Sequence, residues 1–399
     1  MAHIKVIAIV VSCCSLMGAF AFQSAAPISG QWIIEGPPVN GRIELTLQGK
    51  TGGSGHFSSS STVPLEQLRG LAAGQMESAG ANVRFEIVRD AGILTCEGYF
   101  KNGNGSGTFT FSPDPGFISE MQGLGYDGLS TDKVFAMAVH DVTRSYARDL
   151  RSLGLEHIFS DQLIAMRIHG VEIAYVREMK ALGYAELSPD NLVAMRIHGV
   201  TTEFAKEMKT LGYNASIDQM IAMRIHGADT DFVKQVKSSG YTATIDQLVA
   251  MRIHGVTPEF AREMKTFGYN PSIDELVAMR IHGADTNFVK QVKSSGYTPT
   301  IDQLVAMRIH SVTPEFAREM KTLGYNPSID QLVAMRIHSA DTDFVKQVKS
   351  LGYAPTIDQL VAMRIHNVTP DYIRSVQSHG MKDLTIDQLI SLKIHGIGK

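Results

Sequence analysis

A pattern of apolar and polar positions returns every 28 or 29 residues from the middle of the chain to its end. In its clearest copy, at 272–282, the positions between Ser272 and His282 are apolar except for Asp274, Glu275 and Arg280. Such a period is typical of stacked supersecondary units, each of which buries its apolar face only against its neighbours. The pattern therefore predicts an α-solenoid of about ten helical hairpins over 113–399.

Each unit divides into two short helices. The first begins at a hydroxyl cap such as Thr257, followed by Pro258, and ends at a Gly-Tyr pair that includes Gly268, which predicts a Schellman-type stop. The second begins at Ser272, and the acid three residues later, Glu275, predicts a capping box. The second helix is apolar on most sides and the first only along a narrow stripe. We therefore expect the second helices in an inner layer and the first in an outer one.

A longer period lies inside the array. The segments 227–282 and 283–338 differ at five of 56 positions, and two types of first helix alternate along the chain. This indicates duplication of a block of two hairpins. The last copies are more polar and irregular, as expected of a terminal cap.

The period changes to two between residues 28 and 112. Apolar residues alternate with polar ones, as in 43–47 and 83–87, and a meander is expected over 83–111, with the serine-rich segment 58–61 as a loop. These signals predict an antiparallel module of about six strands, a small barrel or a folded sheet. We expect Trp32 to anchor the module from inside, Cys96 to be a buried structural residue, and the module to cap the helical array. The whole chain is thus predicted to be an α+β protein in two parts.

Residues 1–21 predict an export signal. Lys5 precedes an apolar run, and the small residues Ala19 and Ala21 fit a signal-peptidase site. A retained membrane anchor is the first alternative. A lipobox-like sequence ending at Cys13 is the second, with that cysteine lipidated. Each version places the protein outside the cytoplasm, in the periplasm or beyond, and gives it no contact with a membrane except through its N-terminus.

Composition adds little to this interpretation. The chain has 399 residues, 44% of them apolar, and a formal charge of −3, so nothing in the balance points to nucleic acid. Of three cysteines only Cys96 remains after a cut at residue 21, and no intramolecular disulfide can then form.

A histidine closes each second helix. The row comprises His140, His169, His198, His226, His254, His282, His310, His338, His366 and His395. Neighbouring helices lie about 8–10 Å apart, too far for adjacent rings to share one metal ion. We expect each ring instead to cap the last free carbonyls of its helix, so no metal site is predicted.

An arginine stands two residues before most of these histidines. The row comprises Arg167, Arg196, Arg224, Arg252, Arg280, Arg308, Arg336 and Arg364. It could form a stripe that binds an acidic polymer. Because each second helix also begins with an acid, we expect a ladder of arginine-to-acid contacts between neighbouring units.

No local signature of catalysis accompanies these rows. There is no glycine-rich phosphate loop, no His-Glu-x-x-His sequence, and no nucleophile with a base and an orienting acid. We therefore predict no enzymatic activity, no catalytic residue, no cofactor and no small-molecule substrate.

The sequence Leu-Val-Ala-Met-Arg-Ile-His-Gly-Val-Thr-Pro-Glu-Phe, with its Gly-Tyr stop, resembles an uncharacterised helical repeat of bacterial exported proteins. That repeat also occurs beside membrane metallopeptidases of the beta-lactam-sensor type. The resemblance covers 117–395, and the β module resembles the segment that often precedes such repeats. It implies an extracytoplasmic binding role with a protein or cell-envelope partner, or a regulatory partnership with such a peptidase. The peptidase itself is absent from this chain.

A weaker resemblance is to the base-reading repeats of TAL effectors, carried by the Asp-Gln-Leu-Val-Ala helix and a following pair such as His254-Gly255 or His310-Ser311. The units here are shorter, and the array is nearly neutral, whereas a DNA-binding superhelix must offset many phosphates. Nucleic acid is therefore not the expected partner. The sequence favours a non-enzymatic scaffold whose helical array binds proteins or envelope components.

Overall fold

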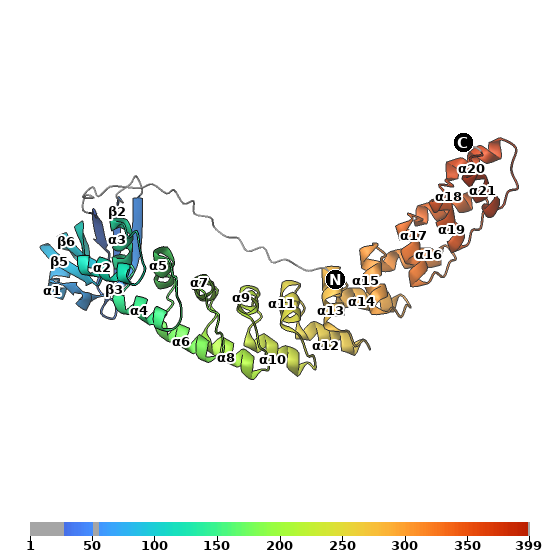
Figure 1. The fold of residues 1–399 in the computed structure, drawn as a ribbon. Helices are drawn as coiled ribbons and strands as arrows, with labels where there is room; N and C mark the ends of the chain where they lie inside the picture. The colour runs from blue at the N-terminus through green and yellow to red at the C-terminus, as the bar shows by residue number, and fades with distance from the viewer. Residues whose placement is uncertain (1–27, 51–55, 398–399) are drawn as a thin grey trace. The chain divides into compact units, whose positions relative to one another are not determined.

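The computed structural model describes residues 28–50 and 56–397, so the predicted export signal and Cys13 lie outside the described residues. The chain divides into two compact units, 1–197 and 198–399. In the described part of unit 1 a β-sheet is followed by helices α2 to α7, and unit 2 contains helices α8 to α21 (Figure 1). The fold is therefore α+β, with a helical repeat array after an antiparallel sheet.

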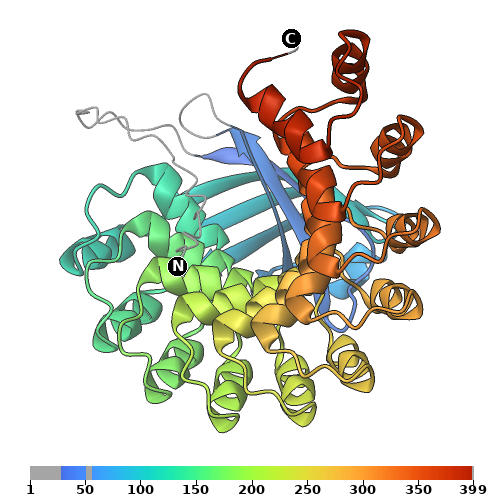
Figure 2. The same cartoon turned by 90° about the vertical axis from the view of Figure 1, so that its right-hand side faces the viewer.

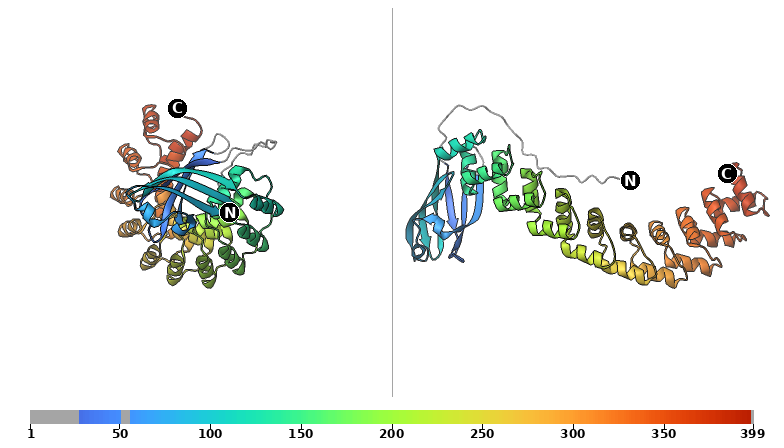
Figure 3. Two further views of the ribbon diagram at one scale, coloured as in Figure 1. Left: turned by 90° about the vertical axis from the view of Figure 1, so that its left-hand side faces the viewer. Right: turned by 60° about the horizontal axis from the view of Figure 1, so that its bottom comes forward.

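The sheet has seven antiparallel strands in the order β3-β2-β1-β7-β6-β5-β4. The strands are β1 (Ser29–Ile34), β2 (Arg42–Lys50), β3 (His56–Pro64), β4 (Leu68–Arg69), β5 (Ala81–Arg89), β6 (Gly92–Lys101) and β7 (Asn104–Pro113). They form one curled layer, as Figure 3 shows. Two short helical segments lie between strands: η1 (Leu65–Gln67) between β3 and β4, and α1 (Ala73–Met76) between β4 and β5. The predicted meander corresponds to β5, β6 and β7. The serine-rich segment 58–61, predicted to be a loop, is instead part of β3.

Apolar residues alternate with polar ones along the strands, and the apolar side chains on one face form the core of the sheet. Trp32 is fully buried, meets the edge of the Phe85 ring at a centroid distance of 5.1 Å, and donates a hydrogen bond from its indole nitrogen to the Glu97 carbonyl oxygen at 3.1 Å. Cys96 is buried as well, and burial raises the pKa of its thiol to about 12. Both residues have the structural positions that the sequence indicates.

The first helices of the array pack on this sheet. Helix α2 (Pro115–Gly123) follows β7 directly, and α3 (Thr131–Val139) lies against β6 and β7. Phe135 of α3 stacks on Phe109 with ring centroids 5.7 Å apart, and it meets Phe57 and Phe111 edge to face. Because the sheet and the first hairpin share these aromatic contacts, the β module covers the end of the helical stack within unit 1.

The remaining helices alternate between the two types predicted. First-type helices are α4 (Arg144–Ser152), α6 (Ile173–Ala181), α8 (Thr202–Thr210), α10 (Thr230–Ser238), α12 (Pro258–Thr266), α14 (Thr286–Ser294), α16 (Pro314–Thr322), α18 (Thr342–Ser350) and α20 (Pro370–Ser378). Second-type helices are α5 (Ser160–Ile168), α7 (Pro189–Ile197), α9 (Ile217–His226), α11 (Ile245–Ile253), α13 (Ile273–Ile281), α15 (Ile301–Ile309), α17 (Ile329–Ile337), α19 (Ile357–Ile365) and α21 (Ile386–Ile394). Within unit 2 the second-type helices form an inner row and the first-type helices an outer row (Figure 2).

The caps form at the predicted residues. Ser272 accepts a hydrogen bond from the backbone of Glu275 at 3.2 Å, and Glu275 accepts one from the backbone of Ser272 at 2.7 Å, which completes the capping box of α13. Thr257 caps α12 with Pro258 in the first turn, and Gly268 after that helix has a φ of +87°. Among the described helices none is long and apolar enough to cross a lipid bilayer.

Candidate functional site

The arginine row forms joints between the outer and inner helix of each hairpin. Each guanidinium lies over the aromatic ring that the preceding outer helix presents, at 4.1 Å from the ring centroid for Arg336 over Phe316 and 5.4 Å for Arg224 over Phe204. The other pairs are Arg167 over Tyr146, Arg196 over Tyr175, Arg252 over Phe232, Arg280 over Phe260, Arg308 over Phe288 and Arg364 over Phe344. Cation–π attraction across each joint thus repeats with the period of the sequence.

Three of these arginines also reach the end of the preceding inner helix. The Nε of Arg280 donates to the Gly255 carbonyl oxygen at 2.9 Å, and the Nε of Arg308 donates to that of His282 at 3.3 Å. Arg364 makes the same contact with His338 at 3.4 Å. The carbonyl end of a helix carries partial negative charge and unpaired acceptors. The arginine of one repeat therefore caps the inner helix of the repeat before it.

The predicted arginine-to-acid ladder is wrong for most of the row. Among the described residues, Arg167 alone of these arginines pairs with carboxylates, those of Asp141 and Glu172. The distance along the helix axis explains this result. Within α13, Asp274 and Arg280 are six residues apart, which corresponds to about 9 Å along the axis. Neighbouring inner helices run side by side in register, so the acid of one unit cannot meet the arginine of the next.

A glutamine-to-aspartate ladder takes its place at the other end of the inner helices. The amide of Gln247 donates to the Asp274 carboxylate at 3.0 Å, and the same contact recurs along both units. The other rungs are Gln162 to Asp190, Gln219 to Asp246, Gln303 to Asp330, Gln331 to Asp358 and Gln359 to Asp387. In the first hairpin Lys133 replaces the glutamine and pairs with Asp161 at 3.1 Å.

The histidines lie at the ends of the inner helices, but their rings seldom cap them. Most are exposed, and within the described part of the row a bond from ring nitrogen to helix carbonyl is formed only by His395, to the Ser391 oxygen at 2.8 Å. Helix α21 is also the last described helix. The prediction that the histidine rings cap these helices is therefore wrong for most of the row. At three of the helix ends the arginine of the next repeat donates to the carbonyl instead.

Lysines and tyrosines join the outer helices in the same way. Lys265 lies over the Tyr241 ring at 4.5 Å from its centroid and donates to the Ser239 carbonyl oxygen at 3.0 Å. Lys237, Lys293, Lys321 and Lys349 repeat both contacts with their preceding repeats. Burial raises the pKa of the tyrosines in this row that show a shift, as it does for Tyr241. The contacts with the lysines therefore explain the position of the tyrosines without a ligand.

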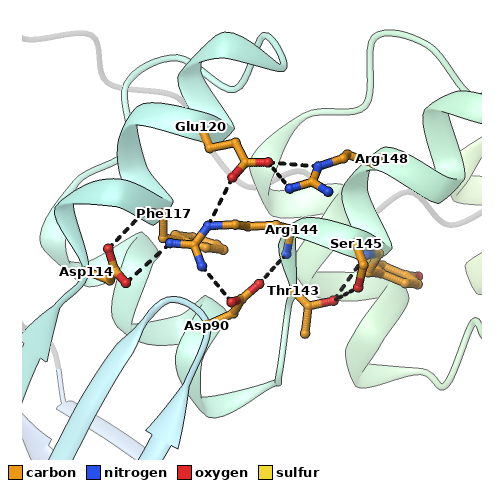
Figure 4. A network of polar contacts seen from close by, with 9 residues as sticks. Asp90, Asp114, Phe117, Glu120, Thr143, Arg144, Ser145 and Arg148 are labelled. Atoms are coloured by element: carbon orange, nitrogen blue, oxygen red, sulfur yellow. Dashed lines mark hydrogen bonds and ion pairs between the residues drawn. The ribbon is translucent and has the colours of Figure 1, made fainter.

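One polar cluster was not singled out by the sequence. The Arg144 guanidinium binds Asp90 at 2.6 Å, Glu120 at 3.2 Å and Asp114 at 3.3 Å (Figure 4). The backbone N–H of Phe117, with Arg144 beside it, lowers the pKa of Asp114. This cluster ties the β5–β6 turn, the start of α2 and the start of α4 together. The acids come from segments far apart in the chain, so no local sequence pattern predicts this cluster.

Once these contacts are assigned, one apolar row remains at the surface. The isoleucine that ends each inner helix was expected to be covered, yet its exposed fraction is 50–56%. The row comprises Ile168, Ile197, Ile225, Ile253, Ile281, Ile309, Ile337, Ile365 and Ile394. No group of three or more His, Cys, Asp or Glu residues within the described ranges is placed to hold a metal ion. The isoleucine row is therefore the candidate site.

No protein-family model matches this chain, and no curated protein matches it either. The resemblance to repeats of exported bacterial proteins consequently stays a prediction from the sequence.

Proposed function

We propose that this protein is a non-enzymatic extracytoplasmic scaffold whose helical array binds protein or cell-envelope partners. The observation that carries the proposal is the isoleucine row. Isolated exposed apolar residues are ordinary on a soluble protein, but one half-exposed isoleucine at the same position of successive repeats is a pattern. Repeat arrays commonly bind through such extended faces.

The arginine, tyrosine and lysine rows support the proposal indirectly. These side chains are engaged within and between repeats: Arg280 lies over Phe260 of its own hairpin, and Lys265 lies over Tyr241 of the preceding repeat. Residues that could have served catalysis or ligand binding are therefore used to hold the array together. The isoleucine row recurs from α5 to α21 and remains accessible.

The test is affinity capture from cell-envelope extract. The full chain is compared with a variant that lacks 227–338, which removes two whole blocks and keeps the remaining hairpins in phase. A second variant carries Ile93→Gln and Tyr99→Gln, two exposed residues of β6, and serves as the control on the β module. We expect the deletion to lose the captured partners and the control to keep them. Equal recovery with the deletion would remove the array from consideration as the binding surface.

We infer export from residues 1–21, with a cut after Ala21 as the principal form and lipidation of Cys13 or retention as an anchor as the others. Mass spectrometry of the mature N-terminus distinguishes the three, because each leaves a different first residue or an added lipid mass. An uncut, unmodified chain that stays in the cytoplasm would contradict the extracytoplasmic role.

A further inference from the structure

The exposed side of each inner helix carries an ordered set of three residues. In α13 these are Asp274, Ala278 and Ile281, spaced by four and three positions, so they lie in line on one face. Asp274 and Ile281 are exposed, and Ala278 between them is half-buried. Because the neighbouring inner helices repeat this order in register, the face carries an aspartate row, an alanine row and an isoleucine row.

The order of these three rows implies a shallow trough along the inner helices. Alanine is the smallest side chain of the three, and the rows on either side of it are about 10 Å apart along the helix axis. Between α3 and α5 the corresponding surface is a depression of about 320 Å³, whose lining includes Asp161, Ala165 and Ile168. A width of about 10 Å is close to the diameter of an α-helix with its side chains.

The aspartates along one edge of the trough are not neutralised. In unit 1 Asp161 forms an ion pair with Lys133, whereas the described aspartates of this row in unit 2 form none. The others that have a partner accept from a neutral amide, as Asp274 does from Gln247, which leaves the charge in place. Like charges about 8–10 Å apart are separated by about one Debye length at physiological salt, so their potentials overlap in part and add more fully at low salt.

The opposite edge differs in charge. Each isoleucine follows an arginine, or a lysine in the case of Ile394, so a cationic partner is repelled near the isoleucine row and attracted near the aspartate row. A partner must therefore present positive charge to one edge and an apolar face to the other. This separation of charged and apolar faces is the property of an amphipathic helix.

We propose that the trough of unit 2 binds a basic amphipathic α-helix that lies across the inner helices, with its lysines or arginines against the aspartate row and its apolar face against the isoleucine row. This inference rests on the proposed scaffold function and specifies the partner and the face. Spanning four repeats at about 8–10 Å each requires a helix of about 24 residues.

Binding of designed peptides to the purified full chain tests the proposal. The probe is a labelled peptide of leucine and lysine in helical period. One comparison peptide carries glutamate in place of lysine, and another has the same leucine and lysine content in strand period. Fluorescence anisotropy at low and at raised salt gives the affinities. We expect the basic helical peptide to bind, to bind more weakly as salt rises, and to exceed both comparison peptides by about tenfold or more.

Two variants locate the site, and a third serves as a matched control. One carries Asp246, Asp274, Asp302 and Asp330 changed to Asn, which keeps an acceptor for the neighbouring glutamine and removes four charges. Another carries Ile253, Ile281, Ile309 and Ile337 changed to Gln. The control carries Glu259, Glu263, Glu315 and Glu319 changed to Gln, which removes four exposed charges from the outer row of the same repeats. Circular dichroism checks that each variant keeps its helices.

We expect the first two variants to lower the affinity for the basic helical peptide about tenfold or more, and the aspartate variant to weaken its salt dependence. The control should bind as the parent chain does. Absence of binding, equal binding of the acidic or strand-period peptide, or unchanged affinity in either inner-face variant would overturn the inference. The scaffold proposal would survive those results if the array deletion still lost its envelope partners, so the two failures are distinguishable.

Discussion

At the scale of single residues, one arginine per repeat combines two kinds of contact. Arg280 places its guanidinium over Phe260 at 4.6 Å from the ring centroid and donates its Nε hydrogen to the Gly255 carbonyl oxygen. Arginine suits this position better than lysine because its planar group can stack and donate at the same time. The sequence shows that an arginine recurs, but not which of its contacts is formed, since the ring comes from the other helix of its hairpin and the carbonyl from the preceding repeat.

A double-mutant cycle on this pair measures the joint. We expect Arg280→Ala and Phe260→Leu to couple by about 0.5–2 kcal/mol in the free energy of unfolding, because the attraction requires both groups. Urea titration followed by circular dichroism gives the four values. The exposed pair Arg262 and Glu259 is the control, where screening by water limits the coupling to about 0.5 kcal/mol. Equal coupling in the two pairs would contradict the joint.

Cys96 provides a second prediction at this scale. Its burial raises the pKa of the thiol to about 12, so the thiolate that reacts with alkylating reagents is nearly absent around neutral pH. We expect iodoacetamide to leave Cys96 unmodified in the native chain and to modify it once denaturant is added. Peptide mass spectrometry reads both states. Rapid modification of the native chain would mean that the sheet core around this residue is open.

At the scale of elements, the repeats differ in how their inner helices end. Gly255 has a φ of +66°, whereas the equivalent Ser311 and Ser339 have φ values of +55° and +58°. A side chain makes this left-handed conformation unfavourable by about 1 kcal/mol or more relative to glycine. The non-glycine residues therefore carry local strain that the rest of the repeat holds in place.

Replacing Ser311 by glycine should relieve that strain. We expect Ser311→Gly to raise the free energy of unfolding by up to about 1 kcal/mol, and the reverse change, Gly255→Ser, to lower it by a similar amount. No atom lies within 4 Å of a Cβ added at Gly255, so a steric clash does not contribute to the change in unfolding free energy of Gly255→Ser. Thermal unfolding of both variants checks the two signs. The same sign for both would refute this explanation.

The glutamine-to-aspartate ladder predicts another effect on an element. Position 275 holds glutamate where the equivalent residue of the next block is Gln331, and a carboxylate cannot donate to Asp302. We expect Glu275→Gln to stabilise the array by about 0.5–1 kcal/mol by adding that hydrogen bond, and Gln303→Glu to destabilise it by a similar amount. Urea titration of both variants measures this, and a loss of stability in Glu275→Gln would contradict the ladder.

The elements themselves were largely predictable from the sequence. Helix limits at Thr257 and Ser272 follow from local capping chemistry, which the period repeats many times. The exposed isoleucine row was not predictable, because a residue such as Ile281 has the same local pattern whether a neighbour covers it or not. The strand that contains 58–61 was missed for a related reason: serines favour loops locally, but here the backbone of β3 pairs with β2 along its length.

At the scale of the molecule, each unit is held by contacts between neighbouring repeats. The inner helices of unit 2 contact those before and after them, as α13 does with α11 and α15, and the sheet in unit 1 contacts α3 of the first hairpin. In such a chain stability is approximately the sum of repeats and their interfaces. A local change should therefore loosen the adjacent repeats and leave distant ones unaffected.

The central claim is that the arginine row holds neighbouring repeats together, which leaves the inner face for a partner. Hydrogen–deuterium exchange of Arg308→Ala tests it most directly, since Arg308 lies over Phe288 and donates to the His282 carbonyl oxygen. We predict faster exchange in α13, α14 and α15, with the β-sheet and α21 unchanged as internal references. Unchanged exchange in α13, α14 and α15 would contradict the account, because the arginine would then be free of the joint.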